Sequence, residues 1–97
     1  MKLYSLEGSF VEGHPVGQQL KEALAAHHWY LKTGFDNGTI LFSGPKAEGG
    51  GGVIVVKSDD IETFCQEDPF VQAGIQTYRV VEFKLFACQD LVKDWFS

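Results

Sequence analysis

The size and charge of the chain limit what it can be. With 97 residues, 44% of them hydrophobic, it is long enough for one domain over residues 1–97, and its formal net charge is −5. Nucleic acids and anionic membrane surfaces are bound by clustered Lys and Arg, so we expect this acidic chain to bind neither. No apolar run approaches the ~20 residues of a membrane span, and the first residues lack the apolar stretch of a signal peptide, so we expect a cytoplasmic protein.

The chain is expected to begin with a strand followed by a long helix. Residues 2–11 place Tyr4, Leu6 and Phe10 on one side of a two-residue period, which predicts a strand. After a turn, the apolar period becomes that of a helix from residue 16 to about Gly34, a plausible stop. Spacings of four, three and four place four side chains on one helical face: Leu20, Leu24, His27 and Leu31.

The rest of the chain alternates short strands and short helices. Turn residues and proline mark the boundaries, because they interrupt both regular structures. The expected elements are a strand over 39–45, a glycine-rich connection over 46–52, a strand over 53–57, a short helix over 60–67 capped by Ser58 or Asp59, a helical turn from Pro69 to Gly74, a strand over 75–86 and a helical tail over 89–96.

This order of elements is that of an α+β, ferredoxin-like βαββαβ fold with an antiparallel sheet and both helices on one face. A sheet whose second face meets water should alternate apolar and polar residues. Residues 53–56 (VIVV) do not alternate, and residues 77–83 (TYRVVEF) have valines on both sides. We therefore expect the second face to be covered, most simply by a second copy in a two-fold homodimer that packs sheet on sheet.

Several patterns that would indicate a cofactor are missing. Cys65 and Cys88 have neither disulfide-scaffold nor zinc-site spacing, so both are expected to be buried, reduced and inert. The glycines of residues 46–52 lead into a strand, whereas a phosphate loop opens a helix. No pair of His, Cys or carboxylate residues has a spacing typical of a metal site. We expect neither a metal nor a cofactor.

One histidine is singled out by the helical period. His27 lies on the apolar face with the leucines, whereas His28 falls on the wet side and His14 lies in a turn. Two interpretations of His27 stay open. It is either a core histidine bonded to nearby backbone or hydroxyl groups, or a general acid or base, since imidazole titrates near neutral pH. The second role needs an acceptor that fixes the tautomer of the ring.

Asp68 is the candidate acceptor. It precedes Pro69, and this pair is a good helix start, so a simple capping role is one interpretation. The other interpretation is a contact between Asp68 and His27. It is possible because, in the predicted fold, the first helix and the segment after the second helix lie on the same side of the sheet. Capping uses one carboxylate oxygen and leaves the second free, so the two roles are compatible.

An ordered set of short motifs points to a family. The motifs are a helix histidine followed by "xxYL" at residues 27–31, "SGP" at 43–45, "DPF" at 68–70 and "AG" at 73–74. Over about residues 16–86 the chain resembles the YciI-like (YCII-related) proteins. The resemblance implies ferredoxin-like subunits that pair into a dimeric α+β barrel, and it implies that His27 and Asp68 form an active-site pair.

The chain also departs from that family. Many members have an arginine just before the histidine, where this chain has Leu24, Ala25 and Ala26. An anion-binding role supplied by that arginine is therefore not expected, and the substrates of other members are not carried over.

Two functions remain as alternatives. The first is a small cofactor-free enzyme, a lyase, dehydrochlorinase or isomerase for a small aromatic or hydroxylated compound, with His27 as general acid/base and Asp68 orienting it. Ser43 and Gly44 would contact the substrate, and Tyr4 would line an apolar pocket. The second is a non-catalytic small-molecule-binding or interaction module; a monooxygenase rests on fold analogy alone. An open pocket that reaches His27 favours the enzyme, and a buried His27 bonded to backbone favours the module.

Overall fold

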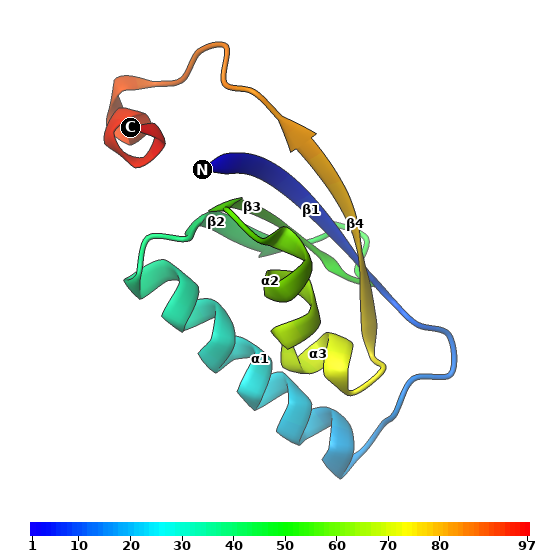
Figure 1. Ribbon diagram of the computed structural model, residues 1–97. Coiled ribbons are helices and arrows are strands. Elements are labelled where there is room, and N and C mark those ends of the chain that lie inside the picture. The colour runs from blue at the N-terminus through cyan, green and yellow to red at the C-terminus, as the bar shows by residue number, and fades with distance from the viewer.

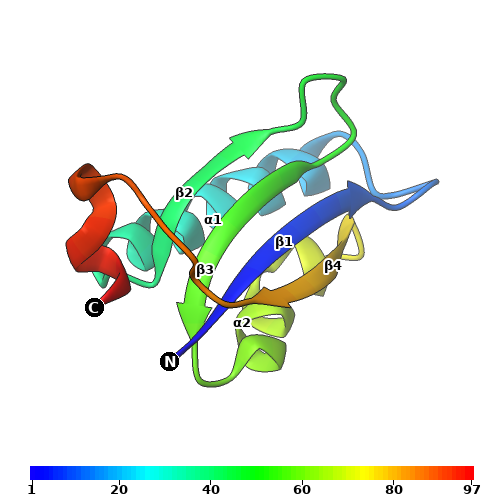
Figure 2. The same ribbon diagram turned by 90° about the horizontal axis from the view of Figure 1, so that it is seen from above.

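The computed structural model describes all of residues 1–97 and contains one four-stranded antiparallel sheet (Figure 1). Its elements are β1 (Lys2–Phe10), α1 (Gln18–Asp36), β2 (Ile40–Pro45), β3 (Gly52–Ser58), α2 (Ile61–Glu67), α3 (Pro69–Gln72), β4 (Gln76–Phe83) and the 3-10 helix η1 (Asp90–Phe96). The strands lie in the order β2-β3-β1-β4, and α1, α2 and α3 lie on one side of them (Figures 1 and 2). The predicted α+β, ferredoxin-like βαββαβ fold is confirmed.

The alternation of β1 decides which side of the sheet becomes the core. Tyr4 and Leu6 point toward the helices and are 7% and 0% exposed. Val56 and Ile54 of β3 lie opposite them in the antiparallel register, so they share this face, and Ile40 of β2 completes the cluster. Partly buried helix side chains pack against it: Leu31, Ile61, Phe64 and Cys65.

Helix α1 runs past Gly34, so the predicted stop at this residue is wrong. Gly34 is buried inside the helix because Ile40 of β2 packs directly against it, and a Cβ atom at Gly34 would lie 2.5 Å from Ile40 Cδ1. The helix instead ends before Gly38, whose φ of +82° lies in the left-handed region that glycine tolerates. No helix in the structure combines the length and the apolar character that crossing a membrane requires.

The buried face of α1 is rotated from the predicted stripe. Leu24 is 40% exposed, whereas its neighbour Ala23 is 9% exposed. Ala23 packs in a second small cluster with Phe70 and Ile75, so α1 lies close to α3 at a small side chain. The prediction that His27 points inward is confirmed, and His28 is exposed as expected.

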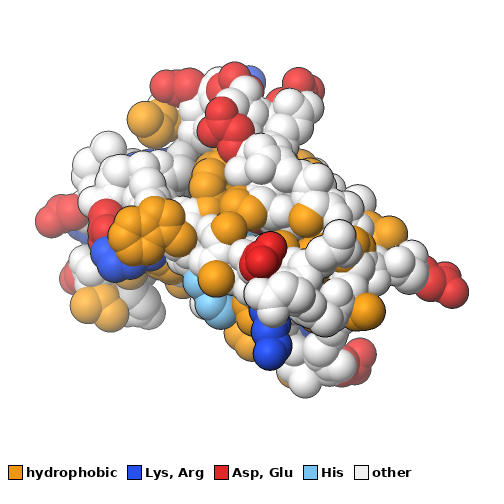
Figure 3. Space-filling view, turned by 90° about the horizontal axis from the view of Figure 1, so that it is seen from below, with side chains coloured by type: hydrophobic (Ala, Val, Ile, Leu, Met, Phe, Trp, Pro, Cys, Tyr) orange, Lys and Arg blue, Asp and Glu red, His pale blue; other side chains and the backbone are white.

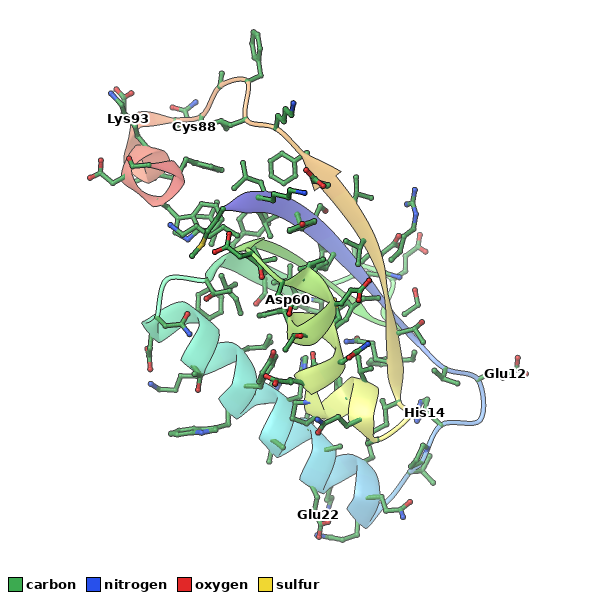
Figure 4. All side chains as sticks on the ribbon, in the orientation of Figure 1. Glu12, His14, Glu22, Asp60, Cys88 and Lys93 are labelled. Carbon is green, nitrogen blue, oxygen red and sulfur yellow. The ribbon has the colours of Figure 1, made fainter.

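Helix α2 begins at a different cap from the one predicted. Asp60, labelled in Figure 4, is the N-cap rather than Ser58 or Asp59. Its Oδ1 accepts a hydrogen bond from the Thr63 backbone N–H at 3.2 Å, and its Oδ2 accepts one from the Thr63 hydroxyl at 2.7 Å. These bonds hold the pKa of the Asp60 carboxyl below its usual value.

The C-terminal segment packs near the ends of α1 and β3. The last strand ends at Phe83 rather than at residue 86, and the predicted helical tail is the 3-10 helix η1. Trp95 Nε1 donates to the Gly38 carbonyl at 2.8 Å. Lys57 Nζ donates to the Trp95 carbonyl at 2.5 Å and lies 4.8 Å from the centroid of the Trp95 ring, a cation–π contact. The tail is therefore tied to two separate parts of the domain.

The sheet face away from the helices carries exposed apolar side chains. Val81 of β4 lies opposite Ser5 and is 42% exposed, and Phe42 and Val53 are also exposed, at 53% and 36%. The helix side of the molecule, in contrast, mixes hydrophobic, acidic and basic side chains (Figure 3). The uncovered sheet face thus has the apolar character that the sequence predicted.

The contact between Gly34 and Ile40 provides a stability test. Gly34→Ala is expected to lower the free energy of unfolding by about 1–3 kcal/mol, the cost of overpacking a filled core. Ile40→Ala removes the atoms that the new methyl group would meet, so in that background Gly34→Ala should be neutral or stabilising by about 0.5–1 kcal/mol. Urea unfolding of the wild type, the two single variants and the double variant measures this coupling. Equal effects in both backgrounds would show that the contact does not restrict residue 34.

Candidate active site

Asp68 lies at the junction of two helices and is completely buried. It ends α2 and is the N-cap of α3, with extended backbone angles and Pro69 at the first helical position. Its Oδ1 accepts a hydrogen bond from the Phe70 backbone N–H at 2.9 Å. The side chain is 0% exposed, so the carboxylate depends entirely on protein donors. Asp68 is therefore a helix cap, as the first interpretation predicted, but capping is not its only interaction.

The same oxygen also binds the histidine of α1. His27 Nδ1 lies 2.7 Å from Asp68 Oδ1, and the His27 side chain is 11% exposed. The imidazole stacks on the ring of Phe70, with centroids 4.2 Å apart and planes 8° from parallel. Stacking on one side and the carboxylate at one edge leave the ring a single orientation. The sequence-based expectation that His27 and Asp68 meet is correct, and the two form a buried pair.

The second carboxylate oxygen is not free, in contrast to our expectation. The Tyr78 hydroxyl of β4 donates to Asp68 Oδ2 at 2.5 Å. Burial, followed by this hydrogen bond, raises the pKa of Tyr78. Asp68 therefore holds α1, the start of α3 and β4 together through three donors. Sequence reasoning missed Tyr78, although the two-residue period of the last strand places it on the inward face with Val80.

The carboxylate determines where the imidazole carries its hydrogen. An ionised carboxylate only accepts hydrogen bonds, so Nδ1 of His27 is the donor, and Nε2 of the neutral ring carries the lone pair. Nε2 has no hydrogen-bond partner in the chain. Every buried side-chain nitrogen or oxygen of the protein has a hydrogen-bond partner. Since Nε2 has none, it is not buried and is open to the space beside it. The ring thus presents a proton acceptor outward.

That space is a cavity of about 400 Å³ between α1 and the sheet. His27 lines it, whereas Asp68 lies behind the imidazole and does not. Ser43 and Gly44, two of the residues expected to contact a substrate, also line it. The remaining lining residues are mostly apolar or glycine: Phe10, Leu24, His28, Leu31, Pro45, Gly51, Gly52, Val53, Ile54, Phe70, Gln76 and Tyr78.

Tyr4 is not brought to the cavity. It is 7% exposed and belongs to the core cluster, where it packs with Leu6, Ile40, Ile54 and Val56. The alternation of β1 correctly predicts that Tyr4 is buried. It cannot show whether a buried side chain lies in the core or in the wall of a cavity.

The two cysteines differ from each other. Cys65 is half-buried, and burial raises the pKa of its thiol to about 11, which keeps it protonated and unreactive at neutral pH. Cys88 is exposed in the segment between β4 and η1, so the expectation that both are buried is wrong (Figure 4). Neither lines the cavity. The side chains contain no group of three or more His, Cys, Asp or Glu placed to hold a metal ion.

Alkaline pH is expected to destabilise the protein through two partly buried tyrosines. Burial raises the pKa of Tyr30 to about 12, and burial with the hydrogen bond to Asp68 raises the pKa of Tyr78 as well. In the unfolded chain a phenol ionises at about pH 10. The folded state therefore keeps protons that the unfolded state loses, and this stabilisation, complete below about pH 10, is lost as the pH rises further.

Urea unfolding between about pH 8 and pH 11 measures this effect. The free energy of unfolding of the wild type should fall above about pH 10. Tyr78→Phe and Tyr30→Phe should each lessen the slope above about pH 10. If wild type and both variants lose stability with the same slope, the two partly buried phenols do not stay protonated in the folded state.

Comparison with known families agrees with this architecture. A family model, the YCII-related domain, matches residues 3–84, nearly the whole of the chain from β1 to β4. No curated protein was found to match the chain. The motifs around His27, Ser43 and Asp68 lie within the matched residues. Since the match covers most of the sequence, the chain belongs to the family of YCII-related domain proteins.

Proposed function

We propose that this protein is a small cofactor-free enzyme in which His27 is the general acid/base and Asp68 orients it. The supporting observation is the arrangement of the two ring nitrogens: Nδ1 is bonded to a buried carboxylate, and Nε2 is open to a cavity. The cavity volume of about 400 Å³ lies in the range of small-molecule sites. The buried acceptor fixes the tautomer, as an orienting carboxylate does in known His–Asp pairs.

The chemistry that fits this site is proton abstraction. Nε2 takes a proton from a C–H bond next to a carbonyl group, and the electron pair of that bond moves toward the carbonyl. The imidazolium that forms is stabilised by a charge-assisted hydrogen bond to Asp68. Return of the proton at another atom would make an isomerase. Departure of chloride or hydroxide from the neighbouring carbon would make a dehydrochlorinase or another lyase.

Other residues of the site have supporting roles in this proposal. The hydroxyl of Ser43 on β2 can hydrogen-bond a substrate, and Gly44 lines the cavity next to it. Tyr4 does not line the cavity, so its role is indirect: it packs in the same core cluster as Ile54, which does line the cavity. Phe70 supplies an apolar ring and holds the imidazole by stacking.

The alternative is a non-catalytic small-molecule-binding module. One observation favours it: Asp68 receives donors from α1, α3 and β4, and a carboxylate that joins three elements would be useful for folding alone. Both functions predict ligand binding. Only the enzyme predicts proton transfer through His27.

Deuterium exchange of a carbon acid separates the two functions. We expect the wild type in D₂O to accelerate exchange into 2-tetralone, a neutral aromatic ketone with acidic C–H bonds, followed by NMR. His27→Gln should remove the acceleration. Asp68→Asn should reduce it by about 10- to 100-fold, the value of one hydrogen bond to a charged group. His14→Gln is the control, because His14 does not line the cavity. Equal exchange with wild type and His27→Gln would reject the acid/base role.

We also propose that two copies pack through the uncovered sheet face. Val81 and Phe42 are exposed on that face, and family membership supports a sheet-on-sheet pair. Val81→Asp would bury an uncompensated charge in the interface and should give a monomer. Val80→Asp is a matched control, because Val80 is 43% exposed on the same strand but lies opposite Leu6 on the helix side. Sedimentation of the three proteins checks this; a monomeric wild type at micromolar concentration would contradict it.

A further inference from the structure

A second polar side chain of the cavity has no assigned role. Gln76 is the first residue of β4 and is only 5% exposed, yet it lines the cavity. Burying a carboxamide is costly unless its hydrogen-bonding groups are used. Its side chain lies beside the Tyr78 hydroxyl and opposes the rise in the pKa of Tyr78, and none of the side-chain hydrogen bonds of the chain involves it. A carboxamide has two donors and an oxygen acceptor, so most of its capacity remains.

The remaining groups of Gln76 face the cavity. No protein donor bonds to its oxygen, and no buried side-chain oxygen or nitrogen lacks a partner, so the oxygen is accessible from the cavity. Gly8 of β1 makes the space in which the carboxamide lies: a Cβ atom at Gly8 would be 2.6 Å from Gln76 Oε1. The amide is thus held between Gly8 and Tyr78, with its free groups toward the cavity.

The cavity wall also limits the charge of a ligand. None of its 15 lining residues is Asp, Glu, Lys or Arg. While the two lining histidines are neutral, as proton abstraction by His27 requires of that ring, an anion would lose its hydration without gaining a cation partner, which is unfavourable in a largely apolar site. Phe10 and Phe70 contribute rings in edge-to-face contact, with centroids 6.0 Å apart, and such rings suit a flat apolar ligand.

We propose that Gln76 is the specificity-determining residue of the site: its carboxamide binds and orients an uncharged hydroxyl, carbonyl or amide group of a flat, apolar ligand beside His27. The proposal deepens the proposed function and rests on it for the chemistry at His27. Gln76 is also placed near the base by the strand itself, because Tyr78 follows it on the same face of β4, Tyr78 donates to Asp68, and Asp68 accepts from His27. A ligand held by Gln76 would therefore be held at a fixed place relative to the imidazole.

A matched pair of probes tests this. Benzamide and benzoate have the same size and shape, but only benzamide is neutral and can both donate to and accept from a carboxamide. We expect an NMR titration with benzamide to shift the side-chain amide signals of Gln76, and benzoate to bind at least about fivefold more weakly. Gln76→Leu should lower the affinity for benzamide by about two- to tenfold, the value of a neutral hydrogen bond. It should also remove the preference for benzamide over benzoate. Gln66→Leu, a change at an exposed glutamine outside the cavity, is the control.

A second variant, Gly8→Ala, keeps the proposal testable if Gln76→Leu does not fold. Gly8→Ala keeps the carboxamide but displaces it, so it should also weaken benzamide. Equal affinity for the two probes, no binding of benzamide, or unchanged benzamide affinity in both Gln76→Leu and Gly8→Ala would overturn the proposal. Binding that depends on Gln76, together with a failed deuterium exchange test, would reject the base at His27 and retain the binding role of Gln76.

Discussion

The buried carboxylate of Asp68 is the interaction on which the rest of the site depends. It is 0% exposed and is satisfied by an imidazole, a backbone amide and a phenol, each from a different element. A buried charge that loses one donor becomes strongly unfavourable, so α1, α3 and β4 must dock together for the fold to tolerate it. The orientation of His27 is then a consequence of how the domain is assembled.

The fold places the groups proposed to react and those proposed to bind on different layers. His27 comes from the helical layer, whereas Ser43 and Gln76 come from two strands that are separated by β3 and β1. A ligand bound as proposed would meet a proton acceptor from one side and hydrogen-bonding groups from the other. Because both layers are packed on one core, the native structure sets the distance between these groups, and preorganisation of this kind is what acid/base chemistry requires.

Much of this was predictable from the sequence, and the exceptions have a common cause. Hydrophobic period gave the order of elements and the inward position of His27, and the Asp68–Pro69 pair indicated a helix cap, because each of these signals lies within one element. Gly34 was misjudged because its reason for being glycine is Ile40 on another element. Tyr78 and Gln76 were missed because their roles depend on how β4 lies against α3 and β1. Local patterns cannot show such contacts.

The position of β4 at the end of the sheet has a consequence for how the site opens. Only β1 pairs with it, so one side of its backbone has no strand partner. Edge strands separate from a sheet at a lower free energy than central ones, and amide hydrogen exchange detects such local opening. Gln76 and Tyr78 both lie on this strand. The part of the site proposed to hold a ligand thus lies on an edge strand, and occupancy would be visible as slower exchange along β4 while the buried centre of the sheet stays unchanged.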